Sequence, residues 1–137
     1  MKTSLFLLGT LVLFGFTQSA MAVTSNITLT EPSMVNPSGQ TISDFHVGSQ
    51  IGVQSMLTNH GTSNQNFTYV VQVLDNNGGT DFLNMFSASM LPNQSFNASQ
   101  VWMPQATGQY TIQVFVWNSL TSAIPLTDVL SKQITVD

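Results

Sequence analysis

The sequence has no cysteine and very little charge. Its 137 residues include two Lys or Arg, six Asp or Glu, and no Cys. Without thiols the chain has no disulfide, thiolate zinc site, cysteine nucleophile or blue-copper centre, whose ligand set requires a cysteine. Both basic residues are lysines, Lys2 and Lys132, and so few cations cannot neutralise a row of phosphates. We therefore exclude nucleic acid as a partner, and anionic lipid on the same ground.

The N-terminus has the pattern of an export signal. Lys2 supplies a short positive region, residues 5–16 are apolar, and Ala20-Met21-Ala22 is an A-x-A cleavage site. About a dozen apolar residues fall short of the ~20 that span a bilayer, so we expect cleavage and no stable membrane insertion afterwards. We predict a signal peptide over residues 1–22 and a secreted, cell-surface-associated domain over residues 23–137.

Beyond the signal, alternating apolar residues and turn residues indicate short β-strands. Tyr110, Ile112, Val114 and Val116 share one face of an extended chain, because side chains alternate with period two. We expect about seven strands, near residues 26–30, 48–58, 67–74, 82–90, 95–102, 110–117 and 129–136. The segment 82–90 alternates weakly and fits either a strand or an irregular edge. The pattern predicts an all-β fold, a single immunoglobulin-like antiparallel β-sandwich.

Two side chains give this expectation more detail. Tyr110 stands at the entry of a central strand, where a tyrosine corner ties the strand to the preceding loop. In the last strand Leu130, Ile134 and Val136 should face the core. Lys132 shares their face, so it needs an edge strand or a path by which its amine reaches water.

The later part of the chain resembles a known family. A W-x-P motif at Trp102, a G-Q-Y motif ending at Tyr110, and a strand ending in Trp117 resemble immunoglobulin-like domains of the CARDB type, found on archaeal and bacterial cell surfaces. The turn at 75–79 fits the same pattern, and the resemblance, shared with small exported archaeal proteins, covers residues 26–137. It implies a scaffold for adhesion or assembly and brings no catalytic residues with it.

Oxygen-bearing side chains alternate in the turn after residues 67–74. Asp75, Asn77 and Asp81 are spaced like the first ligands of a calcium loop. Thr80 stands where an EF-hand has glycine, however, and Phe86 where it has a bidentate glutamate. A hairpin turn around Asn77-Gly78 explains the same residues, so calcium binding is one alternative and a plain turn the other.

Copper is the second metal to consider. His46 and His60 flank residues 48–58, and a strand of that length holds them more than ~20 Å apart, so they cannot share one ion. Either could join methionines in a copper site, although methionine also serves as core filler. The candidate methionines are Met34, Met56, Met85, Met90 and Met103.

The sequence lacks the groups that catalysis requires. There is no G-x-S-x-G motif, and the six acidic residues are scattered mostly in turns rather than paired. Asp44 and His46 could meet on one face of a strand, where a surface ion pair is the ordinary outcome. We expect no enzyme activity and no cofactor.

Surface chemistry is the remaining source of function. Asparagines in N-x-S/T sequons predict a glycoprotein if the source organism modifies exported chains. These asparagines are Asn26, Asn66, Asn93 and Asn97. Phe115 and Trp117 lie on the outer face of the strand 110–117, where they could contact a sugar or a protein or pack beneath a neighbouring segment.

The sequence thus favours a secreted, non-enzymatic cell-surface module for structure or adhesion. Its partners would be other surface proteins or further copies of itself, since free strand edges offer pairing sites. The alternative is a soluble extracellular binding protein for a carbohydrate, copper or calcium.

Overall fold

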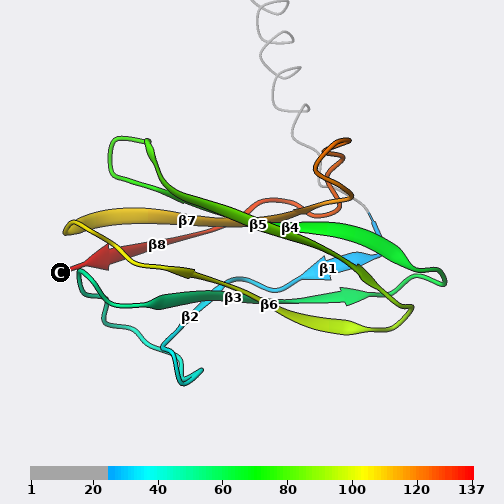
Figure 1. Cartoon of the computed structure of the whole chain (residues 1–137), viewed down its shortest axis with the longest axis horizontal. Helices are drawn as coiled ribbons and strands as arrows, with labels where there is room; N and C mark the ends of the chain where they lie inside the picture. Colours follow the sequence, from blue (N-terminus) through cyan, green and yellow to red (C-terminus); the bar gives the residue numbers. More distant parts are fainter. Residues whose placement is uncertain (1–24) are drawn as a thin grey trace, which may run out of the picture.

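The computed structural model describes residues 25–137, and the predicted signal peptide lies outside them. These residues form eight β-strands and no helix, arranged as two antiparallel sheets that pack face to face (Figure 1). Each sheet has one apolar face, and only another apolar face can cover it. The predicted all-β, immunoglobulin-like sandwich is confirmed.

The first sheet is built around β3 (Ile51–Asn59). One side of β3 pairs along its length with β6 (Ser95–Trp102). The other side pairs with two short strands in succession, β1 (Ile27–Leu29) and β2 (Ser33–Val35). Pro32 lies between them and cannot donate a backbone hydrogen bond, so the edge is interrupted there.

The second sheet has the strand order β5-β4-β7-β8. Its interior strands are β4 (Gln65–Leu74) and β7 (Gly108–Trp117). Its edges are β5 (Thr80–Met90) and β8 (Leu130–Val136). The chain then crosses from β5 to β6, and so from one sheet to the other, through the turn that contains Asn93.

One strand was not expected, and another decides between two alternatives. β2 adds an eighth strand within the proline-rich entry segment, because three residues that carry no strand signal of their own pair with β3. β5 confirms the first of the two alternatives for its segment, a strand, and it has 11 residues with one irregularity opposite Val73 and Leu74. Its alternation is weak because it is an edge strand and few of its side chains are buried.

The core lies between the sheets and contains the apolar faces predicted for β3, β4 and β7. Its buried members include Ile51, Val53, Leu57, Phe67, Val71, Val73, Ile112, Val114 and Val116. Trp102 packs edge-on against Tyr110 with ring centroids 4.9 Å apart. The Tyr110 hydroxyl donates to the Ala106 carbonyl at 2.7 Å, which confirms the tyrosine corner.

One buried asparagine organises the opposite end of the sandwich. The side-chain amide of Asn59 donates to the carbonyls of Ser63, Met90 and Leu91. Its carbonyl oxygen accepts the Gly61 N–H at 2.9 Å. Because one side chain satisfies four backbone groups, it ties the end of β3 to the next loop and to the β5–β6 crossing.

Two other buried hydroxyls have no such partners. Ser55 on β3 and Tyr69 on β4 are 2% and 0% exposed, and neither hydroxyl makes a hydrogen bond within the described residues. Burial raises the pKa of Tyr69 above its ordinary value, and the neighbouring Ser55 side chain partly opposes that rise. Ser55 and Tyr69 therefore lie near each other in the core, one on each sheet.

The end of β8 is bonded along both of its edges. On one side it continues the ladder with β7, where Gly108 pairs with Val136. On the other side Asp137 N–H donates to the Phe45 carbonyl and the Asp137 carbonyl accepts from Val47 N–H. Leu130, Ile134 and Val136 face the core as predicted, and Lys132 is exposed on the open part of the edge.

Candidate functional site

The aromatic pair predicted as a contact surface lies on the outer face of β7. Phe115 and Trp117 are half-buried, with ring centroids 5.3 Å apart. The register places Phe115 beside Val70 and Trp117 beside Thr68 on β4. Val70 and Thr68 are each 1% exposed although they point away from the core. The two rings therefore serve as a partial cover for the centre of this face.

The rest of that face is uncharged. Gln72 on β4 pairs with Gln113 on β7, next to the row that contains Phe115. On β5, Leu83 lies beside Gln72 and Met85 lies beside Val70. The side chain of Leu83 is 52% exposed. Apolar contact area with amide groups and no charge suits a neutral partner better than an ionic one.

The predicted calcium ligands surround one shallow pocket. Asp75, Asn77 and Asp81 line a pocket of about 230 Å³ together with Tyr110. One carboxylate oxygen of Asp75 accepts the N–H groups of Asn77 and Gly79, both at 2.9 Å. Asp81 accepts from the Trp102 indole N–H at 2.9 Å. The structure brings the three residues together, but it uses oxygens of both carboxylates to hold the hairpin and the core tryptophan.

The acidic side chains of this pocket affect the pKa of Tyr110. Burial raises the pKa of its hydroxyl first, and the negative charges of Asp81 and Asp75 raise it further. Nearby negative charge disfavours the phenolate, since two like charges would then share the site. Within residues 25–137, no three His, Cys, Asp or Glu side chains gather closely enough to hold a metal ion.

The two histidines lie at opposite ends of β3. His60 follows Asn59, and its Nε2 forms a 2.9 Å hydrogen bond with the Thr28 hydroxyl. His46 precedes the strand and is exposed. Of the methionines, Met34 and Met90 are buried in the core, where they fill space as ordinary apolar side chains.

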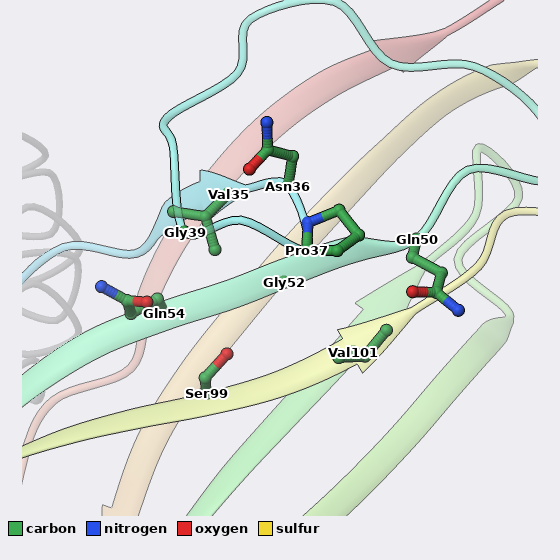
Figure 2. A pocket seen from close by; sticks show the side chains of 9 residues that line it. All are labelled: Val35, Asn36, Pro37, Gly39, Gln50, Gly52, Gln54, Ser99 and Val101. Carbon is green, nitrogen blue, oxygen red and sulfur yellow. The ribbon is translucent and has the colours of Figure 1, made fainter.

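Sequence reasoning missed a pocket on the outer face of the first sheet. Its volume is about 210 Å³, and Gly52 on β3 forms its floor (Figure 2). Figure 2 shows Gln54 and Ser99 beside that glycine, with Val35 and Pro37 above it. A Cβ at Gly52 would lie 2.8 Å from a Val35 methyl group. A glycine inside a strand was the available signal, because it often marks a close approach of another segment.

The four sequon asparagines are accessible, because each of Asn26, Asn66, Asn93 and Asn97 is exposed. Asn93 lies in the β5–β6 turn with a φ of 63°, a left-handed conformation that asparagine tolerates better than most residues. No helix within the described residues is long and apolar enough to cross a membrane.

Comparison with known proteins identifies a family. A family model described as S-layer A-like matches residues 19–136. No curated protein is similar enough to count as a relative.

Solved structures share the sandwich. The CARDB domain of a Pyrococcus furiosus protein, in complex with di-metal ions, matches with a TM-score of 0.56 and 16% identity. That match covers 86% of this chain and 95% of the domain, so the resemblance to CARDB-type domains is confirmed.

Parts of larger enzymes match as well. A β-glucuronidase of glycoside hydrolase family 2 matches with a TM-score of 0.58 and 18% identity, over 77% of this chain and 11% of the enzyme. A Listeria innocua β-glucosidase in complex with glucose matches with a TM-score of 0.60 and 11% identity, over 80% of this chain and 16% of the enzyme. This chain thus spans a small part of each enzyme, and the likeness concerns the fold alone.

Proposed function

The chain belongs to the S-layer A-like family, and on that premise we propose that it is a non-enzymatic structural module of the cell surface that assembles through protein contacts. The observation that carries the proposal is the family match, which extends over residues 19–136. The match to a CARDB domain, over 86% of this chain and 95% of that domain, supports the fold that this role would use.

The chemistry of the surface supports this role. Ser, Thr, Asn and Gln side chains replace charge over most of the exterior, and charged residues make up 6% of the chain. Because few charged side chains lie on the surface, contacts between copies need to remove few charges from water. Open strand edges at β5 and β8 add backbone groups that another chain could pair with.

Export and self-association can be tested in one preparation. The full sequence is expressed in a secreting host, and the exported protein is purified and its N-terminus sequenced. We expect the chain to begin at Val23 and to form oligomers that grow with protein concentration, measured by light scattering and electron microscopy. A chain that stays monomeric up to millimolar concentration would contradict the proposal.

The same preparation tests the other predicted sites. We propose that Asn26, Asn66, Asn93 and Asn97 are acceptors for glycans in an organism that modifies exported chains, and mass spectrometry measures their occupancy. Titration with Ca²⁺ and Cu²⁺, and a glycan array, test the predicted calcium turn and the alternative role as a binding protein. Tight uptake of a sugar or metal by a monomer would favour that alternative.

A further inference from the structure

The charges of the second sheet lie on its two edge strands. Within residues 25–137 Lys132 is the only lysine and there is no arginine, and it lies on β8. Asp81 is the only charged residue of β5. The interior strands β4 and β7 carry no charged side chain. One edge strand of the sheet thus carries a basic side chain, and the opposite edge strand carries an acidic one.

These two charges lie at the same level along the strands. Lys132 pairs with Ile112, which pairs with Val73, which pairs with Phe82, the residue after Asp81. This row of paired residues crosses the whole sheet. Lys132 and Asp81 therefore differ by only about one residue in their position along the strands. Asp81 is the additional residue at the irregularity opposite Val73 and Leu74.

Both charged side chains belong to the core-facing side of the sheet. Lys132 shares the face of its buried partner Ile112, because directly paired residues lie on one face. Asp81 accepts a hydrogen bond from Trp102, which is a core residue of the other sheet. Lys132 forms no ion pair within the described residues, although Asp44 and Asp137 line the same groove beside β8.

Strand direction decides which edges can meet. In a sheet of four antiparallel strands, the first and last strands run in opposite directions. Copies stacked in the same orientation would therefore continue the antiparallel ladder from β8 of one copy to β5 of the next. Pairing β8 with β8 of another copy would instead bring two lysines together, which is unfavourable.

We propose, building on the assembly role above, that copies of this chain join head to tail by pairing β8 of one copy with β5 of the next, with Lys132 beside Asp81 of the neighbour. Contacts of this kind are heterologous and do not close after two copies, so they generate extended assemblies. An inward-facing lysine on an edge strand normally discourages pairing with another chain, and an aspartate on the facing strand would offset that penalty.

The structure limits the length of the contact. Segment 45–47 bonds to the end of β8 at Asp137, and residues 41–45 line the groove beside residues 132–135. A neighbouring strand would therefore have to enter that groove. On β5 the N–H of Met85 is bonded to the side chain of Asn84, whose amide also bonds Gln100 of β6. The backbone groups available for pairing therefore lie beside Lys132 and Asp81, and on β5 they end near Met85.

Disulfide trapping tests the geometry, because the chain has no cysteine of its own. Ser131, Gln113, Gln72 and Leu83 form the neighbouring row across the sheet. Within one copy Ser131 and Leu83 are three strand spacings apart, roughly 14 Å, beyond the ~7 Å that a disulfide can bridge. We expect the double variant Ser131→Cys/Leu83→Cys to form a ladder of covalent oligomers under mild oxidation.

The matched controls are the two single-cysteine variants. Each single-cysteine variant can form at most a disulfide-linked dimer. The head-to-tail contact predicts little of this dimer, because β8 does not meet β8 and β5 does not meet β5. Abundant Ser131→Cys dimers would indicate pairing of β8 with β8 and would overturn the proposal.

Charge reversal tests the ion pair separately. Lys132→Asp gives both edges negative charge, and Asp81→Lys gives both positive charge. We expect each variant alone to need about tenfold higher concentration to assemble, and an equimolar mixture of the two to assemble as the unmodified chain does. Circular dichroism checks folding, because Asp81→Lys also removes the acceptor for Trp102. If Asp81→Lys does not fold, Lys132→Asp and the double variant Ser131→Cys/Leu83→Cys still test the β8–β5 contact.

The outcomes separate this contact from the proposed function. If the unmodified chain assembles but the double-cysteine variant gives no ladder, and Lys132→Asp assembles normally, the β8–β5 contact is wrong and the assembly role stands. If the unmodified chain remains monomeric, the assembly role fails and this contact fails with it.

Discussion

The two tyrosines of the chain should respond in opposite ways to the same chemical change. Tyr110 and Tyr69 are both buried, at 5% and 0% exposure. The hydroxyl of Tyr110 donates to the Ala106 carbonyl at 2.7 Å. The Tyr69 hydroxyl has no hydrogen-bond partner among the described residues. Replacement by phenylalanine removes a bond in one case and an unsatisfied polar group in the other.

The magnitudes follow from these environments. We expect Tyr110→Phe to lower the free energy of unfolding by about 1 kcal/mol, the net value of a typical hydrogen bond. Tyr69→Phe should raise it by about 1 kcal/mol, because a buried hydroxyl without a partner costs about 1–3 kcal/mol and the facing Ser55 offsets part of that cost. The ring packing against Phe86, with centroids 5.7 Å apart, is retained.

Urea denaturation at neutral pH, followed by the fluorescence of the two tryptophans, measures both variants against the unmodified chain. Ser55→Ala and the double variant complete a cycle that isolates the contact between the two hydroxyls. If Tyr69→Phe destabilises the protein as much as Tyr110→Phe, the Tyr69 and Ser55 hydroxyls form a stabilising pair and the reasoning is refuted.

Three further predictions concern stability. Burial raises the pKa of Tyr69 above its ordinary value of 10.0 in the folded state, so the folded chain keeps the phenol proton to higher pH than the unfolded chain. Stability should therefore fall as pH rises above about 10. Melting curves should show a smaller fall for Tyr69→Phe. Gly52→Ala should cost about 1–3 kcal/mol through the contact with Val35, and Gly52→Ala/Val35→Ala should recover part of the loss in melting temperature. Asp75→Ala should cost about 1 kcal/mol by leaving two turn N–H groups without their acceptor, whereas Asp75→Asn should retain most of the stability in the same assay.

The sequence predicted those parts of the fold in which local pattern and burial agree. The alternation of Tyr110, Ile112, Val114 and Val116 is set by a single strand, so β7 and its corner could be found without knowing their neighbours. The exposure of Lys132 was also predictable, because no core position tolerates an unpaired amine. The fold class follows from such strands together.

Features that depend on distant pairing could not be predicted in this way. β2 exists because residues 33–35 meet β3, and their own sequence carries no strand signal. Val70 is buried on an outer face because Phe115 is its neighbour across the register. The bonds of Asn59 join segments about 30 residues apart. The sequence predicted that Asp75 and Asp81 share a hairpin and that Tyr110 forms a tyrosine corner. It did not predict that these two features line the same pocket.

The clamped end of β8 has a mechanical consequence. In the proposed surface assembly, a pull along the chain at Asp137 would load the β7 ladder and the Phe45 and Val47 bonds together in shear. The opposite end offers less resistance, because β1 is joined to β3 by three residue pairs. Under load the sandwich should therefore open from its N-terminal edge, while the edge that carries Lys132 stays in place.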